Sequence, residues 1–403
     1  MLLLKLKFFG INSEFKYVFP LEAERFGALP FYGGGGYCNL KKTNIDFLFS
    51  CNVSKEGVFM QCKDKVTIDT VAERAKVSKA TVSRYLNGKL KMISEDKQER
   101  IFHAINELKY KPNRTAQSLK SKTSGMIGCI VSDMGSPFSS ILTKGINKEC
   151  IKRGYQLILT DSEDDAVIEK NAINSLIERN VDGLIINSTG NNDRFILELY
   201  EKGLPIVLAD RPLATEGEID TVTTNNAESI KMALLYLKKI GYTKIAFFSS
   251  AVKTNEVRKI RYQAFCQNVQ EIFKYPGEEY AYFYSDLMDC KDKLNIFISN
   301  NPSERIAILA INGVCLLDVL KVIINYTGIN IGTEIGICGF DNWGWADLIG
   351  PGITTITQNT WKVGETAAKL LFERILENPQ AEARTKVLNN LLEVRGSTVC
   401  FAK

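Results

Sequence analysis

The chain lacks the residues that most enzymes use for acid–base or metal chemistry. Its 403 residues include one histidine, His103, and ten cysteines, and no two cysteines form a Cys-x-x-Cys pair. This excludes a Ser–His–Asp site and a histidine-ligated metal site outside that one position, and it disfavours structural zinc. The glycine run 33–36 is followed by Tyr37 and not by Gly-Lys-Ser/Thr, so it is no phosphate-binding loop. We expect a protein that is not an enzyme and that needs no cofactor and no metal.

The N-terminus also lacks an apolar run long enough for a signal peptide or a membrane helix. Met1–Lys5 is too short and too interrupted to be a signal peptide or a membrane helix. Cys129, Cys315 and Cys338 lie in apolar runs, where we expect buried free thiols. Free thiols suit a reducing compartment. The sequence therefore predicts a cytoplasmic protein without membrane contact.

Charge is unevenly distributed along the chain. Residues 65–124 contain 14 lysines and arginines against 6 acidic residues, a net charge of +8, and residues 1–64 carry +2. Because the whole chain carries +5, residues 125–403 carry −5. A basic segment joined to a mildly acidic body favours phosphate contacts from the segment alone.

The basic segment has the pattern of a helix-turn-helix. Val71, Ala72 and Ala75 share one face of a first short helix, and Val82 and Leu86 share one face of a second. Ser78 stands where the second helix needs an N-cap. A third helix is predicted from about Ser94 to Leu108, with apolar residues at helical spacing. The outward face of the second helix is short, basic and polar, which suits a DNA major groove about 12 Å wide; it holds Lys79, Ala80, Ser83, Arg84 and Asn87. The alternative is a small helical bundle with an ordinary solvated face.

A short segment follows the third helix. Pro112 ends that helix, because the residue before a proline is disfavoured in the helical region. Asn113 then caps a stretch that runs to about Ser121 and is too short to be a stable helix alone. It is either a hinge that folds against DNA or a frayed linker. In the hinge interpretation, Leu119 inserts between base steps of the minor groove.

The remaining 280 or so residues alternate between apolar runs and amphipathic stretches. This order predicts βαβ units with buried parallel sheets, and the length favours two lobes over one core. The predicted strands are Met126–Val131, Tyr155–Leu159, Gly183–Ile186, Ile206–Leu208, Lys244–Phe248, Ala307–Ala310 and Glu334–Gly339. The predicted helices include Ser139–Arg153, Glu169–Arg179, Ala227–Lys239 and Val314–Tyr326.

Polar residues end several of the predicted strands. Since ligands bind at the carboxyl ends of strands in open α/β sheets, these residues are candidates for a binding cleft; they are Asp133 to Phe138, Asn187 to Thr189, Asp210, Arg211, Asn312 and Asp341. Arg261, on a predicted helix, offers a guanidinium that can bind a carboxylate. Each residue alone is more often a cap or turn residue, and it is their recurrence at strand ends that indicates a cleft. Trp343 and Trp345 either stack on a sugar or fill the edge of a lobe.

Several phrases together resemble the lactose-repressor (LacI/GalR) family of bacterial transcription regulators. They are V-T-I-D-T-V-A at 66–72, V-S-K-A-T-V-S-R-Y-L-N at 77–87, N-E-L-K-Y-K-P-N-R-T-A-Q-S-L at 106–119, V-D-G-L-I-I-N at 181–187, I-G-I-C-G-F-D at 335–341 and P-G-I-T-T-I-T-Q at 351–358. The resemblance implies an α/β body of two periplasmic-binding-protein-like lobes with parallel sheets behind the helix-turn-helix headpiece. It also implies chain crossings between the lobes near Thr223, Ile356 and Val387.

The resemblance also assigns residues to sites. It implies base contacts from Lys79, Ala80 and Ser83 and a minor-groove wedge at Leu119, although Lys120 follows the leucine where the family usually has a small residue. The residues expected to contact DNA are Thr67, Ser78, Lys79, Ala80, Thr81, Ser83, Arg84, Asn87, Asn113, Ala116, Leu119 and Lys120. The residues expected to contact an effector are Phe138, Asn187, Asp210, Arg211, Arg261, Asn312, Asp341 and Trp343.

Within the family, I-L-A-I-N-G at 308–313, D-T-V-T-T-N-N at 220–226 and L-I-G-P-G-I-T-T-I at 348–356 are similar to ketodeoxygluconate (KDG) regulators. That likeness implies a sugar acid, KDG or a uronate, as effector. We therefore expect a ligand-controlled regulator that binds a double-stranded operator as a homodimer, because one headpiece reads one half-site. The alternative is a sugar-binding module or a sugar-metabolising enzyme on the same body.

These expectations define a domain plan. A headpiece spans 65–111, a hinge 112–124 and a body 125–403; lobe 1 covers about 125–223 and 357–386, and lobe 2 about 224–356 and 387–403. Residues 1–64 are aromatic-rich without a sustained period. We expect them to be untranslated or disordered, with Met60 near the expected start. A small extra domain is the alternative.

Overall fold

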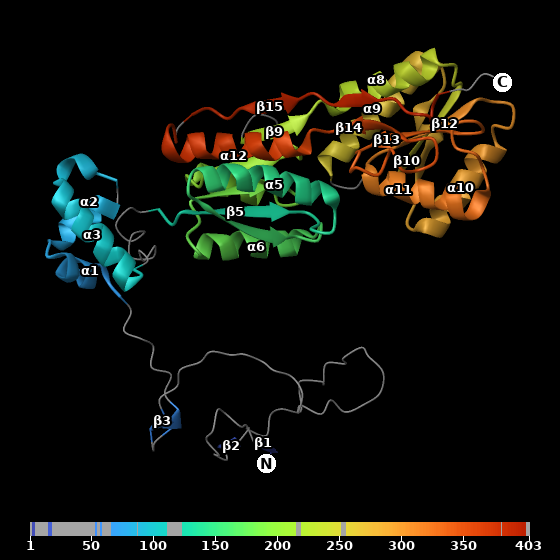
Figure 1. Ribbon diagram of the computed structural model, residues 1–403. Coiled ribbons are helices and arrows are strands. Elements are labelled where there is room, and N and C mark those ends of the chain that lie inside the picture. The colour runs from blue at the N-terminus through green and yellow to red at the C-terminus, as the bar shows by residue number, and fades with distance from the viewer. Residues whose placement is uncertain are drawn as a thin grey trace. The chain divides into compact units, whose positions relative to one another are not determined.

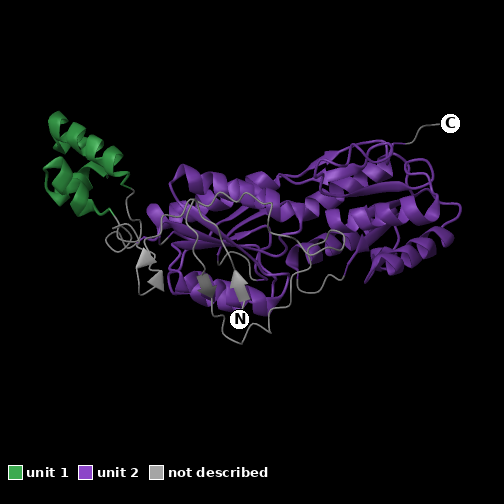
Figure 2. Cartoon of the chain, turned by 60° about the horizontal axis from the view of Figure 1, so that its bottom comes forward, with its two compact units in different colours: residues 1–110 green, residues 111–403 purple. Residues whose placement is uncertain are grey.

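The computed structural model forms two compact units, residues 1–110 and 111–403 (Figure 2). It describes residues 66–110 except Asn87, residues 123–399 except 215–218, 251–254 and 380, and four short strands before them. Those strands form two antiparallel pairs, β1 (Leu2–Leu4) with β2 (Phe15–Tyr17) and β3 (Val53–Ser54) with β4 (Gly57–Val58). The predicted hinge helix and the DNA contacts at Asn87, Asn113, Ala116, Leu119 and Lys120 lie outside the described residues.

The headpiece is a helical bundle built as the sequence predicts. Its elements are α1 (Ile68–Ala75), α2 (Lys79–Leu86), the 3₁₀ turn η3 (Leu90–Met92) and α3 (Glu95–Leu108). Val71, Val82 and Ile101 are fully buried and hold the three helices together. Lys76 ends α1 in the left-handed conformation, so the chain turns sharply before α2 begins. The predicted helix-turn-helix is confirmed.

Lobe 1 of the body contains an entirely parallel six-stranded sheet (Figure 1). Its strands, in sheet order, are β15 (Thr385–Leu388), β9 (Asp220–Thr224), β8 (Ile206–Ala209), β7 (Gly183–Ile186), β5 (Met126–Val131) and β6 (Gln156–Asp161). Its helices are α5 (Pro137–Lys152), α6 (Ala166–Glu178), α7 (Asp193–Glu201) and α12 (Thr360–Leu376). The central strands β7 and β8 are buried throughout, which explains their continuous apolar runs.

Lobe 2 repeats this plan with a second six-stranded sheet. Its strands, in sheet order, are β16 (Leu391–Glu393), β14 (Thr354–Thr357), β13 (Gly336–Phe340), β12 (Ile306–Ala310), β10 (Lys244–Ser249) and β11 (Ala281–Phe283), and only β16 is antiparallel to its neighbour. Its helices are α8 (Asn226–Lys239), α9 (Glu256–Phe273), the 3₁₀ turn η4 (Gly277–Tyr280), α10 (Leu287–Ser299) and α11 (Gly313–Val322), with the π-helical turn η5 (Ile323–Thr327) after α11.

The chain passes between the lobes three times. The passages lie between β9 and α8, between β14 and α12, and between β15 and β16. Each falls one to three residues later than the sequence predicts, because Thr223 and Val387 pair with each other in the lobe 1 sheet and Ile356 still pairs with Leu392 in lobe 2. Residues 224, 387 and 388 therefore belong to lobe 1 and residue 357 to lobe 2, which corrects the predicted boundaries.

Two glycines let α12 return to lobe 1 and pack closely on α5. A Cβ atom added at Gly364 would lie 2.1 Å from the carbonyl oxygen of Leu142, and one added at Gly145 would lie 2.1 Å from that of Trp361. No side chain fits at either position without separating the helices. None of the helices that the structure describes is long and apolar enough to cross a membrane.

Candidate DNA-reading helix and effector cavity

The candidate DNA-reading surface is the exposed face of α2. Thr67 caps α1 through a reciprocal hydrogen-bond pair with Thr70, and the Ser78 hydroxyl accepts a bond from the backbone N–H of Thr81 at 3.2 Å. Both caps fix the start of a helix with a side-chain oxygen, and the sequence predicts the one at Ser78. Lys79, Ala80 and Arg84 are exposed, whereas Thr81 and Ser83 are half-buried. Their contact with DNA stays a prediction.

Lys79 has a partner within the headpiece. Its ammonium lies 2.8 Å from the carboxylate of Asp69 on α1, and both side chains are more than half exposed. An exposed pair of this kind contributes little to stability. Lys79 can therefore exchange this carboxylate for a base edge or a phosphate at small cost.

The candidate effector cavity lies between the lobes, at the carboxyl ends of both sheets. All eight residues that the sequence predicts for effector contact line it, and so do Asp133 and Ser136 of the predicted strand-end range 133–138. The lining residues that the sequence did not indicate are Ser132, Ser139, Asn255, Val257, Arg258 and Gln358. Whether these residues bind an effector stays a prediction, but strand-end polarity located the cavity.

Arg261 forms the floor of this cavity. It comes from the second turn of α9, is 3% exposed, and its guanidinium lies 3.5 Å from the ring centre of Phe340. Its N–H groups donate to Asn226 Oδ1 at 2.8 Å, to the carbonyl of Ile311 at 2.7 Å and to Gln358 Oε1 at 3.0 Å. Burial lowers the pKa of Arg261 to about 10, so the group stays positively charged at neutral pH.

Two buried carboxylates flank this cation. Asp341 accepts from Gln358 Nε2 at 2.7 Å and from the backbone N–H of Gly313 at 3.1 Å. Asp210 and Asp341 occupy equivalent positions in the two lobes. Asp210 follows β8, the third strand from β15 in the lobe 1 sheet, and Asp341 follows β13, the third strand from β16 in the lobe 2 sheet. Both residues have positive φ angles, 73° and 74°. Burial raises the pKa of each carboxyl, and Arg261 opposes that rise.

Asp210 differs from Asp341 in having an unused oxygen. It is 7% exposed, and its Oδ1 has no hydrogen-bond partner among the described residues. A buried acceptor without a donor costs about 1–3 kcal/mol. Because Asp210 lines the cavity, a hydroxyl of a bound molecule can supply the missing donor.

Replacing Asp210 with asparagine is expected to raise the melting temperature at neutral pH. The free energy of unfolding should increase by an amount on the order of 1 kcal/mol. The folded-state pKa of Asp210 lies above the unfolded value near 3.8 because of burial, so the wild type loses stability as pH rises from about 4 through that pKa. The variant lacks this loss of stability. Between pH 4 and 8, the difference in melting temperature between the variant and the wild type should widen as pH rises and then level off. Asp292→Asn, at an exposed position of α10, is the control; a gap of equal size at every pH would contradict burial as the cause.

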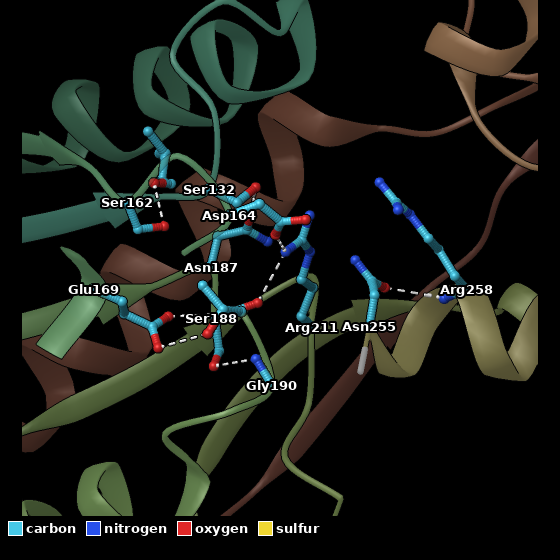
Figure 3. Close-up of polar contacts among 12 residues, drawn as sticks. Ser132, Ser162, Asp164, Glu169, Asn187, Ser188, Gly190, Arg211, Asn255 and Arg258 are labelled. Atoms are coloured by element: carbon cyan, nitrogen blue, oxygen red, sulfur yellow. Dashed lines mark hydrogen bonds and ion pairs between the residues drawn. The ribbon is translucent and has the colours of Figure 1, made fainter. Parts of the chain in front are cut away.

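Lobe 1 supplies a second polar wall to the cavity. Asn187 accepts from the Ser132 hydroxyl at 2.9 Å and donates to the carbonyl of Ala209 at 2.9 Å. Arg211 donates to Asp164 Oδ1 at 2.8 Å and to the carbonyl of Ser188 at 3.0 Å (Figure 3). These bonds fix the Arg211 guanidinium, whose side chain is 12% exposed, at the cavity wall.

The remaining predicted residues take different positions. Asn312 caps α11 by accepting from the backbone N–H of Cys315 at 2.9 Å, so its predicted cap role and its place in the cavity coexist. Trp343 lines the cavity and covers Gly313, where an added Cβ would lie 2.5 Å from its ring. Trp345 packs against the lobe 2 core instead. Trp345 thus fills the edge of a lobe, whereas stacking of Trp343 on a sugar stays a prediction.

Two of the lining residues that the sequence did not indicate carry weak signals in it. Arg258 lies three residues before Arg261 and so on the same side of α9. Gln358 follows β14, whose threonine-rich sequence was not recognised as a strand. A polar residue after this strand would have been a candidate by the rule that located Asp341.

The three predicted buried thiols are confirmed. Cys129, Cys315 and Cys338 are buried and free, and burial raises the pKa of Cys129 and Cys338 to about 12. His103 is exposed on α3. Within the described part of the chain, no cluster of histidine, cysteine or acidic residues is arranged to hold a metal ion.

Family comparison matches both units of the chain. Residues 67–113 match the model for bacterial regulatory proteins of the lacI family, and residues 124–393 match the periplasmic binding proteins and sugar binding domain of the LacI family. The chain belongs to the LacI family. This LacI-family protein is a helix-turn-helix transcription regulator whose body is of the sugar-binding type, as the sequence predicts.

Individual relatives agree with this assignment. The HTH-type transcriptional regulator KdgR of Bacillus subtilis is 37% identical over 314 residues, covering 77% of this chain and 91% of the relative. The regulator PtxS of Pseudomonas aeruginosa is 32% identical over 342 residues, covering 85% and 98%. The predicted likeness to KDG-type regulators is thereby confirmed.

Solved structures of the family share the fold. The CelR–cellobiose complex is 25% identical, covering 82% of this chain and 99% of its own, with a TM-score of 0.61. A lac repressor dimer bound to operator and the anti-inducer ONPF is 22% identical, covering 84% and 100%, with a TM-score of 0.71, and supports the fold alone.

Proposed function

We propose that this LacI-family regulator binds its operator as a homodimer and changes its affinity for that operator when a sugar acid occupies the cavity. The observation that carries the proposal is the convergence of all eight predicted effector residues, from both lobes, on one cavity. A ligand that contacts both lobes changes the relative populations of the conformations of the body. This change links effector binding to DNA binding.

The polarity of the cavity supports a polyhydroxylated ligand. Asp210 offers an unused acceptor, and Arg261 has five N–H donors of which three are engaged within the protein. Sugar hydroxyls both donate and accept hydrogen bonds, so they can pair with the Asp210 acceptor and with the remaining Arg261 donors. Trp343 adds an aromatic surface at the same cavity. Likeness to KDG-type regulators and three lining arginines favour a sugar acid over a neutral sugar.

The dimer follows from the size of the headpiece. One recognition helix reads one half-site, so two headpieces related by a twofold axis are needed for a full operator. We further propose that the protein is cytoplasmic and without enzymatic activity. No histidine lies in the body, and its relatives are named as regulators.

An operator-shift assay with the full chain tests the regulatory function. Operator DNA should be bound with nanomolar affinity at physiological salt, about 10³-fold or more tighter than random DNA. Addition of the cognate sugar acid should change that affinity. Equal affinity for operator and random DNA, with and without sugar acids, would contradict the proposal.

Replacing Lys79 or Ser83 with alanine is expected to weaken operator binding by about 1–3 kcal/mol and to relax preference at one base pair. The reason is loss of a base-edge contact from the exposed face of α2. Binding should be measured on the operator and on variants substituted at each position. Lys97→Ala, an equal change of charge on the exposed surface of α3, is the control. Equal weakening on random DNA would show that the residue contacts only phosphate.

A further inference from the structure

Glu169 is a buried carboxylate of lobe 1 that does not line the effector cavity. It lies in the first turn of α6 and is 0% exposed. Its two oxygens accept three hydrogen bonds from the loop between β7 and α7: from the Thr189 backbone N–H at 2.8 Å, from the Thr189 hydroxyl at 2.9 Å and from Asn192 Nδ2 at 2.7 Å. Taking a carboxylate out of water is costly unless such bonds are made. Glu169 therefore holds this loop in one conformation.

The peptide group between Ser188 and Thr189 connects Glu169 with the wall of the cavity. Its N–H donates to Glu169 Oε1, and its carbonyl, which belongs to Ser188, accepts from Arg211 Nη1 at 3.0 Å. A trans peptide group is planar and its N–H and C=O point in opposite directions, so holding the N–H also aims the carbonyl. Hydrogen bonds in a chain polarise one another, so the carboxylate strengthens this carbonyl as an acceptor. Figure 3 shows Ser188 between Glu169 and Arg211.

Arg211 is held a second time by the segment that leads into α6. Asp164 accepts from Arg211 Nη1 at 2.8 Å, and the next residue, Asp165, is the N-cap of α6. The start of α6 thus determines the position of the guanidinium in two ways, directly through Asp164 and through the peptide that Glu169 holds. Because Arg211 lines the cavity, a change at Glu169 moves a cation at the cavity wall.

We propose that Glu169 is a positioning residue for effector binding: it holds the Ser188–Thr189 peptide, and this peptide aims the Arg211 guanidinium at the bound sugar acid. This role rests on the proposed sugar-acid function of the cavity. Glu169 itself does not touch the ligand, since it does not line the cavity. Its contribution to affinity passes through Arg211.

Calorimetry on the full chain tests this role with three acids, 2-keto-3-deoxygluconate, D-gluconate and D-galacturonate. Glu169→Met fills a similar space but offers no oxygen to the Thr189 N–H. It is expected to weaken binding of the best acid about tenfold or more, where tenfold corresponds to 1.4 kcal/mol. Glu169→Gln keeps an acceptor oxygen for the same N–H and should stay within about threefold of the wild type.

A double-mutant cycle with Arg211→Gln separates positioning from general disruption of the fold. Arg211→Gln alone should weaken binding of the acid. Glu169→Met added to Arg211→Gln should then change the affinity less than about twofold, because the group that Glu169 positions is already gone. Additive losses of affinity would show that Glu169 acts independently of Arg211 and would overturn the proposal.

Glu149→Met is the matched control. Glu149 is a 2% exposed glutamate on α5 of the same lobe, it is paired with Arg153, and it does not line the cavity. This variant should lose stability and keep the affinity for the acid. An equal loss of affinity in Glu149→Met would assign the effect of Glu169→Met to destabilisation of the lobe.

A shorter carboxylate serves if Glu169→Met melts too early for calorimetry. Glu169→Asp keeps the charge but withdraws the carboxylate by one methylene from the Thr189 N–H, and it should weaken binding at least about threefold. If the wild type binds none of the acids, the sugar-acid function fails, and this role fails with it. If the wild type binds one of them and the Met and Asp variants of Glu169 or Arg211→Gln keep wild-type affinity, the positioning role is wrong while the function stands.

Discussion

Replacing Arg261 with alanine is expected to abolish the effector response and to lower the free energy of unfolding by about 3–5 kcal/mol. The substitution leaves Asp210 and Asp341 buried without their cation, and it removes the donors to Asn226, Ile311 and Gln358. Effector affinity should fall by about 30-fold or more, because the floor of the cavity loses both its charge balance and its shape. Calorimetry with sugar acids and chemical denaturation measure the two effects.

Arg305 provides the matched control for this prediction. It is a half-buried arginine of lobe 2 that lies 4.5 Å from the ring centre of Tyr242 and donates to the carbonyl of Ile240 at 2.6 Å, but it does not line the cavity. Arg305→Ala should reduce stability and leave the effector response intact. Wild-type effector affinity in Arg261→Ala would show that this arginine does not contribute to the site.

Replacing Arg374 with alanine is expected to destabilise lobe 1 by about 3–5 kcal/mol, a large part of the 5–15 kcal/mol typical of folded proteins. Arg374, on α12, is 5% exposed and lies 2.9 Å from the fully buried carboxylate of Asp220 on β9. It also donates to the carbonyls of Pro379 and Ala381, in the segment that leads to β15. Its removal leaves the buried Asp220 carboxylate with the backbone N–H of Arg384 and the more distant Arg384 guanidinium, and it takes the donor from two carbonyls. The midpoint of urea unfolding should fall clearly.

Arg384→Ala is the comparison for Arg374. Arg384 also approaches Asp220, at 3.7 Å, but its side chain is 40% exposed and so its charge is screened by solvent. Its removal should cost less than about 1 kcal/mol. Similar losses of unfolding free energy in the two variants would contradict the view that burial makes the Asp220–Arg374 pair important for stability.

The secondary structure of the buried regions followed from the sequence because hydrophobic burial leaves a local pattern. Met126–Val131 and Gly183–Ile186 are strands with the predicted bounds, since all their residues except the half-buried Met126 are buried, as in a parallel strand covered on both faces. The strands β9 and β14 were missed because threonine fills most of them. Edge strands β15 and β16 were missed as well, because their exposed faces carry no apolar run.

The lobe boundaries were placed too early for a related reason. Thr223 and Val387 lie at the ends of strands where the composition does not change, so only their hydrogen-bonded register shows that both still belong to lobe 1. Register is a property of two segments that are 164 residues apart, and no local signal encodes it. Gln358 is 17 residues from Asp341 and 97 residues from Arg261, and only the folded chain brings the three side chains into contact.

Spacing and periodicity, which are local properties of the chain, predicted the helix-turn-helix. Resemblance to the LacI family, together with polar residues at strand ends, indicated the eight residues that line one cavity. The distribution of charge within that cavity depends on the three-dimensional fold. The fold placed Asp210 and Asp341 beside Arg261 and left Arg211 and Arg258 on opposite lobes. The electrostatic character of a guanidinium depends on its burial and on the carboxylates near it. These come from segments far apart in the chain, so the fold assigns each arginine its role.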